Sequence, residues 1–392
     1  MKVTRIRQDV APISGAIANA YIDFSHMTAS IVAVTVETGD GRRAVGFGFN
    51  SNGRYAQPGL LAERFIPRLL AAGELPAHPD GGFDPAAAWA AMMRNEKPGG
   101  HGERSVAVGV LDMALWDAAA KLAGKPLWRL LADRYHAGAA DAAAWVYAAG
   151  GYYQPGKGTA GLVEEIRRYL DAGYRVVKIK IGGAPGTPLA EALREDLARI
   201  EAVLTVLGGD GSRLCVDANG RFDLPGALTY AAHLAPYRLR WFEEPLDPLD
   251  YAMHAVLAEH YEAPLATGEN LFSLPDARNL IRHAGLRPDR DVLQFDPALC
   301  YGLVEYLRIL EMLRAHGWSP RRCVPHGGHQ FALHIAVGLG LGGNESYPEV
   351  FAPFGGFADD TPIRDGMVRL TETPGIGFEA KADLYALLRR LL

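Results

Sequence analysis

The sequence has few of the features that mark extracellular, membrane or nucleic-acid-binding proteins. It contains only three cysteines, and their spacing fits neither a disulfide framework nor a metal-binding motif. Cys215 and Cys323 lie in apolar strand-like runs and Cys300 follows another, so we expect reduced thiols in the core. No apolar run is long enough to span a membrane, and residues 1–14 lack the apolar core of a signal peptide. We therefore expect a cytoplasmic protein.

The chain also lacks a net positive charge. The formal net charge is −5 at pH 7, which provides no basic field to hold nucleic acid or an acidic membrane surface. Hydrophobic residues make up 49% and charged residues 22%, the balance of an ordinary globular protein. A length of 392 residues is enough for two or three domains with a large core. An acidic substrate would need positive groups placed locally.

The first third of the chain has the pattern of an α+β domain. Thr28–Glu37 and Arg43–Asn50 are rich in β-branched or alternating residues and flank a glycine turn, which predicts a hairpin. Ser105–Leu122 has apolar residues near helical spacing. We predict an N-terminal α+β capping domain over residues 1–135, completed by a short strand and a final helix in residues 366–392.

Residues 136–365 alternate between strand-like and helix-like segments. Eight strands are predicted, at residues 143–149, 175–181, 213–218, 239–243, 264–268, 292–296, 321–325 and 346–350. The helices predicted between them include Leu162–Ala172, Leu189–Leu207 and Leu303–His316. Parallel strands joined by right-handed crossovers close into a barrel. The predicted fold is therefore α/β, a modified (β/α)8 (TIM-type) barrel with an irregular last unit.

Three acidic residues end successive strand-like segments at an even spacing of 26 residues: Asp217, Glu243 and Glu269. Equivalent points of successive strand–helix units meet at one end of a parallel barrel, and three carboxylates there suit Mg²⁺. A single acid at a strand end is more often a helix cap or a solvated loop residue. The regular spacing favours a metal site. Glu244 is a rival to Glu243, but the strand phase favours Glu243.

Two lysines share one face of a predicted strand. In Arg175–Gly182, Lys178 and Lys180 alternate with apolar residues, so both point to the same side. Inside a barrel, their mutual repulsion and their desolvation would lower the lysine pKa toward a value useful for a base. The alternative is an edge strand with a solvated lysine face. The glycines that follow and the metal-type acids favour the interior position.

A histidine and an aspartate end neighbouring predicted strands. His326 lies in Val324–His329, and Asp296 ends the preceding strand. An aspartate on one imidazole nitrogen fixes the tautomer and leaves the other nitrogen for proton transfer. A lone histidine is usually structural, but the pairing with Asp296 favours a catalytic role. We expect His329 to open the following helix.

Together these residues resemble the enolase superfamily, mandelate racemase subgroup, along the whole chain. Within that subgroup the sequence is most similar to the D-tartrate dehydratases. Long and unusual strings carry this finer resemblance: Asn19–Phe24, Gly48–Tyr55, Asn95–Arg104, Tyr147–Tyr153 and Gly340–Pro348.

The resemblance implies Mg²⁺ as the cofactor, bound by Asp217, Glu243 and Glu269. It implies that Lys180 removes the proton next to the substrate carboxylate, with Lys178 supporting the charge. It also implies that His326, oriented by Asp296, protonates the leaving hydroxyl. Further substrate contacts are implied for residues in or near the matching strings: Lys97, Glu345, Asn19, Tyr21, Asn52 and Tyr147.

The implied reaction is the dehydration of D-tartrate to oxaloacetate and water. The expected partner is a small hydroxy-dicarboxylate, and we expect a homo-oligomer. One alternative is another acid-sugar dehydratase or an epimerase on the same scaffold, since fold and metal site do not separate these. The other is a non-catalytic binding protein. Loss of Lys180, His326 or a metal ligand would have supported it, and all are present.

Overall fold

A three-stranded antiparallel sheet opens the chain in the computed structural model, which describes residues 1–13 and 15–392. Its strands, in spatial order, are β1 (Lys2–Pro12), β2 (Thr28–Glu37) and β3 (Arg43–Phe49). The predicted hairpin is confirmed, since Glu37 pairs with Arg43 and Ile31 with Phe49.

The segment after β3 is helical. It comprises α1 (Pro58–Leu60), the π-helical turn η1 (Leu61–Phe65), α2 (Ile66–Ala71), α3 (Pro85–Met92), α4 (Glu103–Leu122) and α5 (Leu127–Tyr135). Helix α4 is buried continuously over residues 105–120, because it packs on both the sheet and the rest of the molecule. The contact with β3 is close: a Cβ on Gly46 would lie 1.9 Å from the Ala114 carbonyl oxygen. Glycine is required there to let strand and helix meet.

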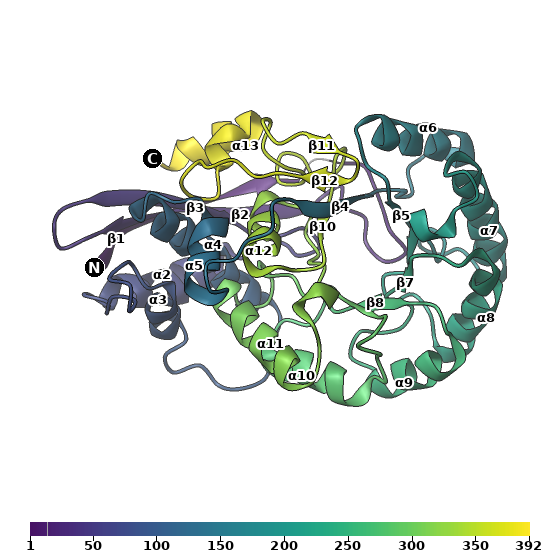
Figure 1. Cartoon of the computed structure of the whole chain (residues 1–392), viewed down its shortest axis with the longest axis horizontal. Helices are drawn as coiled ribbons and strands as arrows, with labels where there is room; N and C mark the ends of the chain where they lie inside the picture. The colour runs from purple at the N-terminus through teal and green to yellow at the C-terminus, as the bar shows by residue number, and fades with distance from the viewer. Residues whose placement is uncertain (14) are drawn as a thin grey trace.

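A second, curled sheet holds the parallel strands (Figure 1). The strands are β4 (Ala144–Ala149), β5 (Val177–Lys180), β6 (Leu214–Asp217), β7 (Trp241–Glu243), β8 (Leu265–Thr267), β9 (Val292–Leu293) and β10 (Asn344–Ser346). Strands β4 to β9 are neighbours in chain order, and β10 pairs in parallel with β4. The α/β class and a curled parallel sheet are therefore confirmed, whereas a complete barrel stays a prediction.

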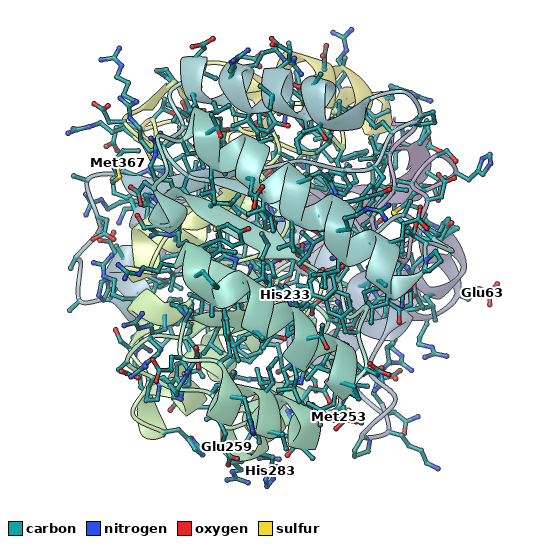
Figure 2. All side chains as sticks on the ribbon, turned by 90° about the vertical axis from the view of Figure 1, so that its right-hand side faces the viewer. Glu63, His233, Met253, Glu259, His283 and Met367 are labelled. Atoms are coloured by element: carbon teal, nitrogen blue, oxygen red, sulfur yellow. The ribbon has the colours of Figure 1, made fainter. Side chains whose placement is uncertain are left out.

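Helices line the outside of this curl (Figures 1 and 2). They are α6 (Gly158–Asp171), α7 (Leu189–Val206), α8 (Leu224–Leu234), α9 (Tyr251–His260), α10 (Leu274–His283), α11 (Leu303–Ala315) and α12 (Gln330–Leu339). Three short 3₁₀ turns lie between these elements. Turn η2 (Gly211–Arg213) precedes β6, and η3 (Ala235–Tyr237) follows α8. Turn η4 (Pro320–Arg322) precedes Cys323.

Side-chain caps fix where several of these helices begin. Asp223, Asp250 and Ser273 each accept a hydrogen bond from the backbone N–H three residues later, at the start of α8, α9 and α10. Such caps satisfy an otherwise unpaired donor of the first turn. His329 does the same for α12, as predicted.

Two predicted strands differ from the structure. Residues 321–325 form no extended strand: η4 occupies Pro320–Arg322, and Cys323 makes only an isolated parallel bridge to Leu293. Pro325 has no N–H to donate to a ladder, which limits pairing there. The strand predicted at 346–350 is β10, shifted toward the N-terminus to Asn344–Ser346, and it ends before Pro348.

The tail returns to both sheets. The short strands β11 (Ile363–Arg364) and β12 (Met367–Val368) form a hairpin, and β12 pairs antiparallel with β4. The turn η5 (Phe378–Ala380), helix α13 (Ala382–Leu388) and turn η6 (Arg389–Leu391) follow. The Leu392 carbonyl oxygen accepts hydrogen bonds from Arg5 and Arg7 of β1. The predicted division into domains stays a prediction.

Among the helices of the described chain, none combines the length and apolar character needed to cross a membrane.

Candidate active site

The carboxyl ends of three parallel strands bring charged residues side by side. Lys180, Asp217 and Glu243 are the last residues of β5, β6 and β7, and the register sets Lys180 opposite Asp217 and Asp217 opposite Glu243. Glu269 follows the next strand, β8, by two residues. The apolar residues that alternate with them, such as Ile179 and Val216, are fully buried behind the sheet.

The three acids form a group that can hold a metal ion. One carboxylate oxygen from each of Asp217, Glu243 and Glu269 lies within 4.8 Å of the others. Oε2 of Glu269 is buried and has no hydrogen-bond partner among the described residues. Burial and the nearby Asp217 carboxylate raise the pKa of Glu243, which reflects crowded negative charge. Mg²⁺ prefers oxygen ligands, and this group offers one carboxylate oxygen from each of three residues, with Oε2 of Glu269 free of hydrogen bonds within the described chain.

The rival acid, Glu244, lies outside this group. Its two carboxylate oxygens accept hydrogen bonds from Nδ2 of Asn270 at 3.1 and 2.9 Å. The predicted choice of Glu243 over Glu244 therefore agrees with the geometry.

Both lysines of β5 point inward, as predicted, and both are buried. Nζ of Lys180 binds Asp217. Nζ of Lys178 binds Glu243 and lies 2.6 Å from Oε1 of Glu345. The lysines thus sit among carboxylates rather than in an apolar pocket.

The predicted lowering of the lysine pKa values is wrong for this arrangement. Burial does act to lower the pKa of both groups, but attraction from the carboxylates outweighs it. Glu243 and Glu345 raise the pKa of Lys178, and Asp217 raises that of Lys180. The prediction considered repulsion between the two lysines and left out the acids that face them.

His326 and Asp296 form the predicted pair. Nδ1 of His326 lies 2.9 Å from Oδ2 of Asp296, and Nε2 lies 3.8 Å from Oε2 of Glu269. Burial favours the neutral ring, but Glu269 and the bond to Asp296 outweigh it and raise the pKa of His326 to about 10. The imidazole is therefore protonated near neutral pH and can donate a proton from Nε2.

The backbone that carries Lys180 is held from the helix side. Arg199 of α7 donates hydrogen bonds to the carbonyl oxygens of Lys180 (2.9 Å) and Gly151 (2.6 Å). Asp196, one turn earlier, accepts the Gly182 N–H at 2.6 Å and the Tyr230 hydroxyl at 3.0 Å. These contacts fix the ends of β4 and β5 relative to each other. Sequence reasoning missed them, because nothing local marks a helical Asp and Arg as facing a strand end.

A cavity of about 260 Å³ opens beside these groups. Lys180, His326 and Glu269 line it, together with the predicted contacts Asn19, Tyr21 and Asn52. Its remaining walls come from Ile22, Phe24, Gly53, Arg54, Tyr152, Asn219, Pro248, Asn270 and Tyr347. Such a volume suits a small ligand rather than a drug-sized one.

Three predicted substrate contacts do not line the cavity. Lys97 is exposed in the loop between α3 and α4. Glu345 is buried beside Lys178 and accepts the Gly327 N–H. Tyr147 is fully buried with its ring 5.6 Å from Nζ of Lys178. Contact of these three residues with substrate stays a prediction.

Sequence reasoning missed Arg54, Asn270 and Tyr347 in the cavity wall. Arg54 and Tyr347 lie inside strings quoted for the family resemblance, so the signal was present, but the strings did not indicate which side chains face inward. Asn270 directly follows the metal-type Glu269.

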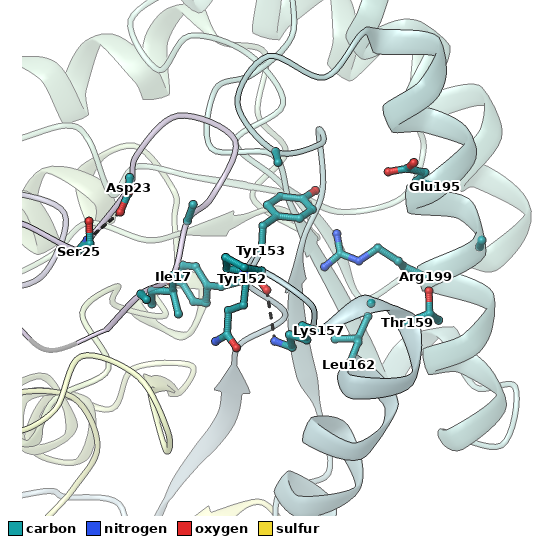
Figure 3. A pocket seen from close by; sticks show the side chains of 17 residues that line it. Ile17, Asp23, Ser25, Tyr152, Tyr153, Lys157, Thr159, Leu162, Glu195 and Arg199 are labelled. Carbon is teal, nitrogen blue, oxygen red and sulfur yellow. Dashed lines mark hydrogen bonds between the residues drawn. The ribbon is translucent and has the colours of Figure 1, made fainter.

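A larger cavity, of about 910 Å³, lies elsewhere (Figure 3). It is bounded by residues 16–18, Tyr153, the start of α6 and part of α7, and it shares only Tyr152 with the smaller cavity. Its cations are already paired: Nζ of Lys157 lies 2.5 Å from Glu165, and Arg199 is bound to Asp196. The metal-type acids do not line it, so the smaller cavity is the candidate active site.

Comparison with known proteins agrees with this geometry. Residues 161–384 match the family described as "Enolase C-terminal domain-like". The chain is 27% identical to 3,6-anhydro-alpha-L-galactonate cycloisomerase from Streptomyces coelicolor, over 96% of each chain. It is 28% identical to L-talarate/galactarate dehydratase from Salmonella typhimurium, over 89% of this chain and 80% of the relative.

A solved structure of a similar protein contains magnesium. The L-talarate dehydratase from Polaromonas sp. JS666, complexed with Mg and L-glucarate, superposes with a TM-score of 0.74 at 27% identity. The match covers 96% of this chain and 94% of that one. In this chain the acidic group of Asp217, Glu243 and Glu269 could hold such an ion, which is consistent with the likeness.

Proposed function

The chain belongs to the enolase superfamily, alongside Mg²⁺-dependent acid-sugar dehydratases and cycloisomerases, and we propose that it dehydrates D-tartrate to oxaloacetate. The main support for the proposal is that three kinds of functional group lie together at one small cavity. A metal-type acidic group, a buried lysine and a histidine–aspartate pair all reach it. A binding protein without catalysis would not need all three.

Asp217, Glu243 and Glu269 would hold Mg²⁺, and when bound the ion supplies positive charge that stabilises the dianion formed from an α-carboxylate. Carboxylates that held the ion would no longer stabilise the ammonium form of Lys180. Burial and the neighbouring Lys178 would then favour the neutral amine, which is the form that removes a proton. Lys180 takes the proton from the carbon next to the reacting carboxylate, and Lys178 remains as a fixed positive charge.

His326 completes the elimination. Asp296 and Glu345, which are not among the proposed metal ligands, favour the protonated ring. Its Nε2 donates a proton to the β-hydroxyl, the carbon–oxygen bond breaks, and water leaves. The electron pair of the broken carbon–hydrogen bond forms the carbon–carbon double bond of an enol, which rearranges to the 2-keto acid. Asp296 holds the imidazole through Nδ1 so that Nε2 faces the cavity.

The choice of D-tartrate rests on the sequence strings that resemble the D-tartrate dehydratases. The cavity residues Asn19, Tyr21 and Asn52 come from these strings and would bind the hydroxyl groups and the far end of the substrate. We further propose that Glu345 and Tyr147 support substrate binding through Lys178, and that Lys97 adds a more distant positive charge that favours an anionic substrate.

A second candidate is the dehydration of a longer acid sugar. It is favoured by the relative named for talarate and galactarate and by the solved relative that carries L-glucarate. The catalytic residues would keep the same roles, since only the far end of the substrate differs.

We also propose how the chain is divided into domains. Residues 136–365 would form a modified (β/α)8 barrel, in which the bridge between Leu293 and Cys323 joins β9 to the closing segment. Residues 1–135 and 366–392 would form the cap. The expected homo-oligomer and cytoplasmic location stay predictions.

A substrate panel tests the function. The purified protein with Mg²⁺ should release a 2-keto acid from D-tartrate with the highest kcat/KM among four- to six-carbon acid sugars. EDTA should abolish the activity, and added Mg²⁺ should restore it. If a longer acid sugar has the highest kcat/KM, the second candidate replaces D-tartrate. If no acid sugar reacts, or EDTA has no effect, the dehydratase proposal is wrong.

A further inference from the structure

Arg54 is the one arginine among the described residues that line the candidate active-site cavity. It lies in the loop after β3, whereas the other charged lining residues, Lys180, His326 and Glu269, come from the region of the strand ends. The cavity is small, about 260 Å³, so one ligand can meet the proton-transfer residues and Arg54 together.

Neutral groups hold Arg54 in place. Its Nη2 donates to Oδ1 of Asn270 at 2.9 Å, and its guanidinium carbon lies 4.8 Å from the centre of the Phe272 ring. Asn270 is fixed in turn, because its Nδ2 donates to Glu244. The Asn50 side chain also donates to the Arg54 carbonyl oxygen at 2.9 Å. The guanidinium is therefore positioned before any ligand arrives.

The charge of Arg54 is not neutralised. Over residues 1–13 and 15–392, no carboxylate forms an ion pair with it. Arg199, which supports the backbone of Lys180, differs, because its guanidinium lies 3.3 Å from the carboxylate of Asp196. An ordered guanidinium that faces a cavity with free N–H groups is suited to bind a carboxylate by two parallel hydrogen bonds.

We propose that Arg54 binds the second carboxylate of the substrate, at the end remote from the carbon that loses its proton. The inference rests on the proposed dehydratase function and narrows its substrate class to diacids. A monoacid of the same length would place a neutral hydroxymethyl group against the guanidinium and leave its charge unpaired. The two relatives described above are named for both classes, a 3,6-anhydrogalactonate and galactarate. The unpaired guanidinium of Arg54 in this chain favours the diacid class.

The test compares matched substrates that differ only at the far end. For wild type, Arg54→Met and Arg54→Lys, kcat/KM is measured on D-tartrate and on the four-carbon monoacid with a terminal hydroxymethyl group. The same comparison is made with galactarate and galactonate. Arg54→Met should lower kcat/KM on the reactive diacid by about 30- to 3,000-fold, the range for truncating one member of a desolvated charge pair. It should change the monoacid value by less than about fivefold, and Arg54→Lys should recover part of the loss.

Two controls keep the outcomes distinct. Arg167→Met removes an exposed arginine of α6 whose side chain is 58% accessible, so it reports the effect of lost surface charge alone. In a Lys180→Met background, calorimetric titration with Mg²⁺ and the diacid reports binding without turnover, and Arg54→Met should weaken it by a similar factor.

Equal losses on diacid and monoacid, or a wild type that prefers the monoacid, would overturn the role of Arg54 while leaving the dehydratase intact. Absence of wild-type activity on every acid sugar would instead overturn the proposed function. Circular dichroism and the thermal midpoint of Arg54→Met establish that the variant is folded before either conclusion is drawn.

Discussion

The two walls of the active-site cavity are built differently. On the strand side, Lys180 lines the cavity and is bonded to Asp217, and the adjacent Lys178 is bonded to Glu243, so each of these buried charges has a partner. On the loop side, Tyr21 is 64% exposed and Arg54 has no acidic partner among the described residues. Strand ends and the residues that follow them place the groups that perform chemistry, and the loops between β1 and β2 and after β3 carry the groups that select the ligand.

The difference teaches where change is tolerated. A substitution at a strand end leaves buried partners unpaired and alters the metal group, so it affects every substrate. A substitution in a loop removes one contact to the far end of the ligand and affects only substrates that reach it. The three predictions below test this division.

The largest effect is expected on the strand side. Asp217→Asn, Glu243→Gln and Glu269→Gln each remove a charge from the metal group, and kcat should fall by about 1,000-fold or more on every substrate, because metal stabilisation is worth several kcal/mol. Mg²⁺ affinity, measured by calorimetry, should fall in parallel. Glu259→Gln, an exposed acid of α9 visible in Figure 2, is the matched control and should keep full activity. Near-normal Mg²⁺ binding by one of the three variants would remove that acid from the site.

A somewhat smaller effect is expected for the proton-transfer residues, about 100- to 10,000-fold in kcat. Lys180→Met should abolish both turnover and exchange of the substrate α-proton with D₂O. His326→Asn should stop dehydration but retain exchange, since Lys180 is intact. NMR in D₂O measures both processes, and His233→Asn, on the outer face of α8, serves as the control. Normal exchange by Lys180→Met would show that another group is the base.

The smallest effect is expected for Lys97. It is exposed and does not line the cavity, so it contributes as a surface charge worth about 0.2–1 kcal/mol. Lys97→Met should therefore lower kcat/KM on D-tartrate by less than about fivefold, and less still at high salt. A loss above about 30-fold that is confined to the diacid would contradict this. It would place Lys97 on the second carboxylate when substrate is bound, and the loop side would then contain two such cations.

Much of the strand side could be predicted because its signal is local. Strand alternation put Lys178 and Lys180 on one face, and the spacing of Asp217, Glu243 and Glu269 put three acids at one edge. Both patterns arise from the geometry of single strands and repeated units. Positions could therefore be predicted before any tertiary contact was known.

Features that depend on distant contacts could not be predicted. The pKa of Lys178 depends on Glu345, which is 167 residues away in the sequence. The strand expected at 321–325 lacks a regular ladder, because η4 and Pro325 interrupt it. Arg54 faces the cavity because Asn270 and Phe272 hold it there, and nothing in the sequence near Arg54 indicates those partners.

The contacts of Arg199 have a consequence for engineering new activities on this scaffold. Its side chain ties the carbonyl oxygens of Lys180 and Gly151 together from behind the sheet, and Asp196 fixes Gly182. The orientation of Lys180 thus depends on helix α7, although no described residue of α7 lines the candidate active-site cavity. A designer who grafts new recognition loops should carry residues 196 and 199 of α7 along with β5. Directed evolution that adjusts the angle of proton removal should accumulate changes on that helix rather than in the cavity wall.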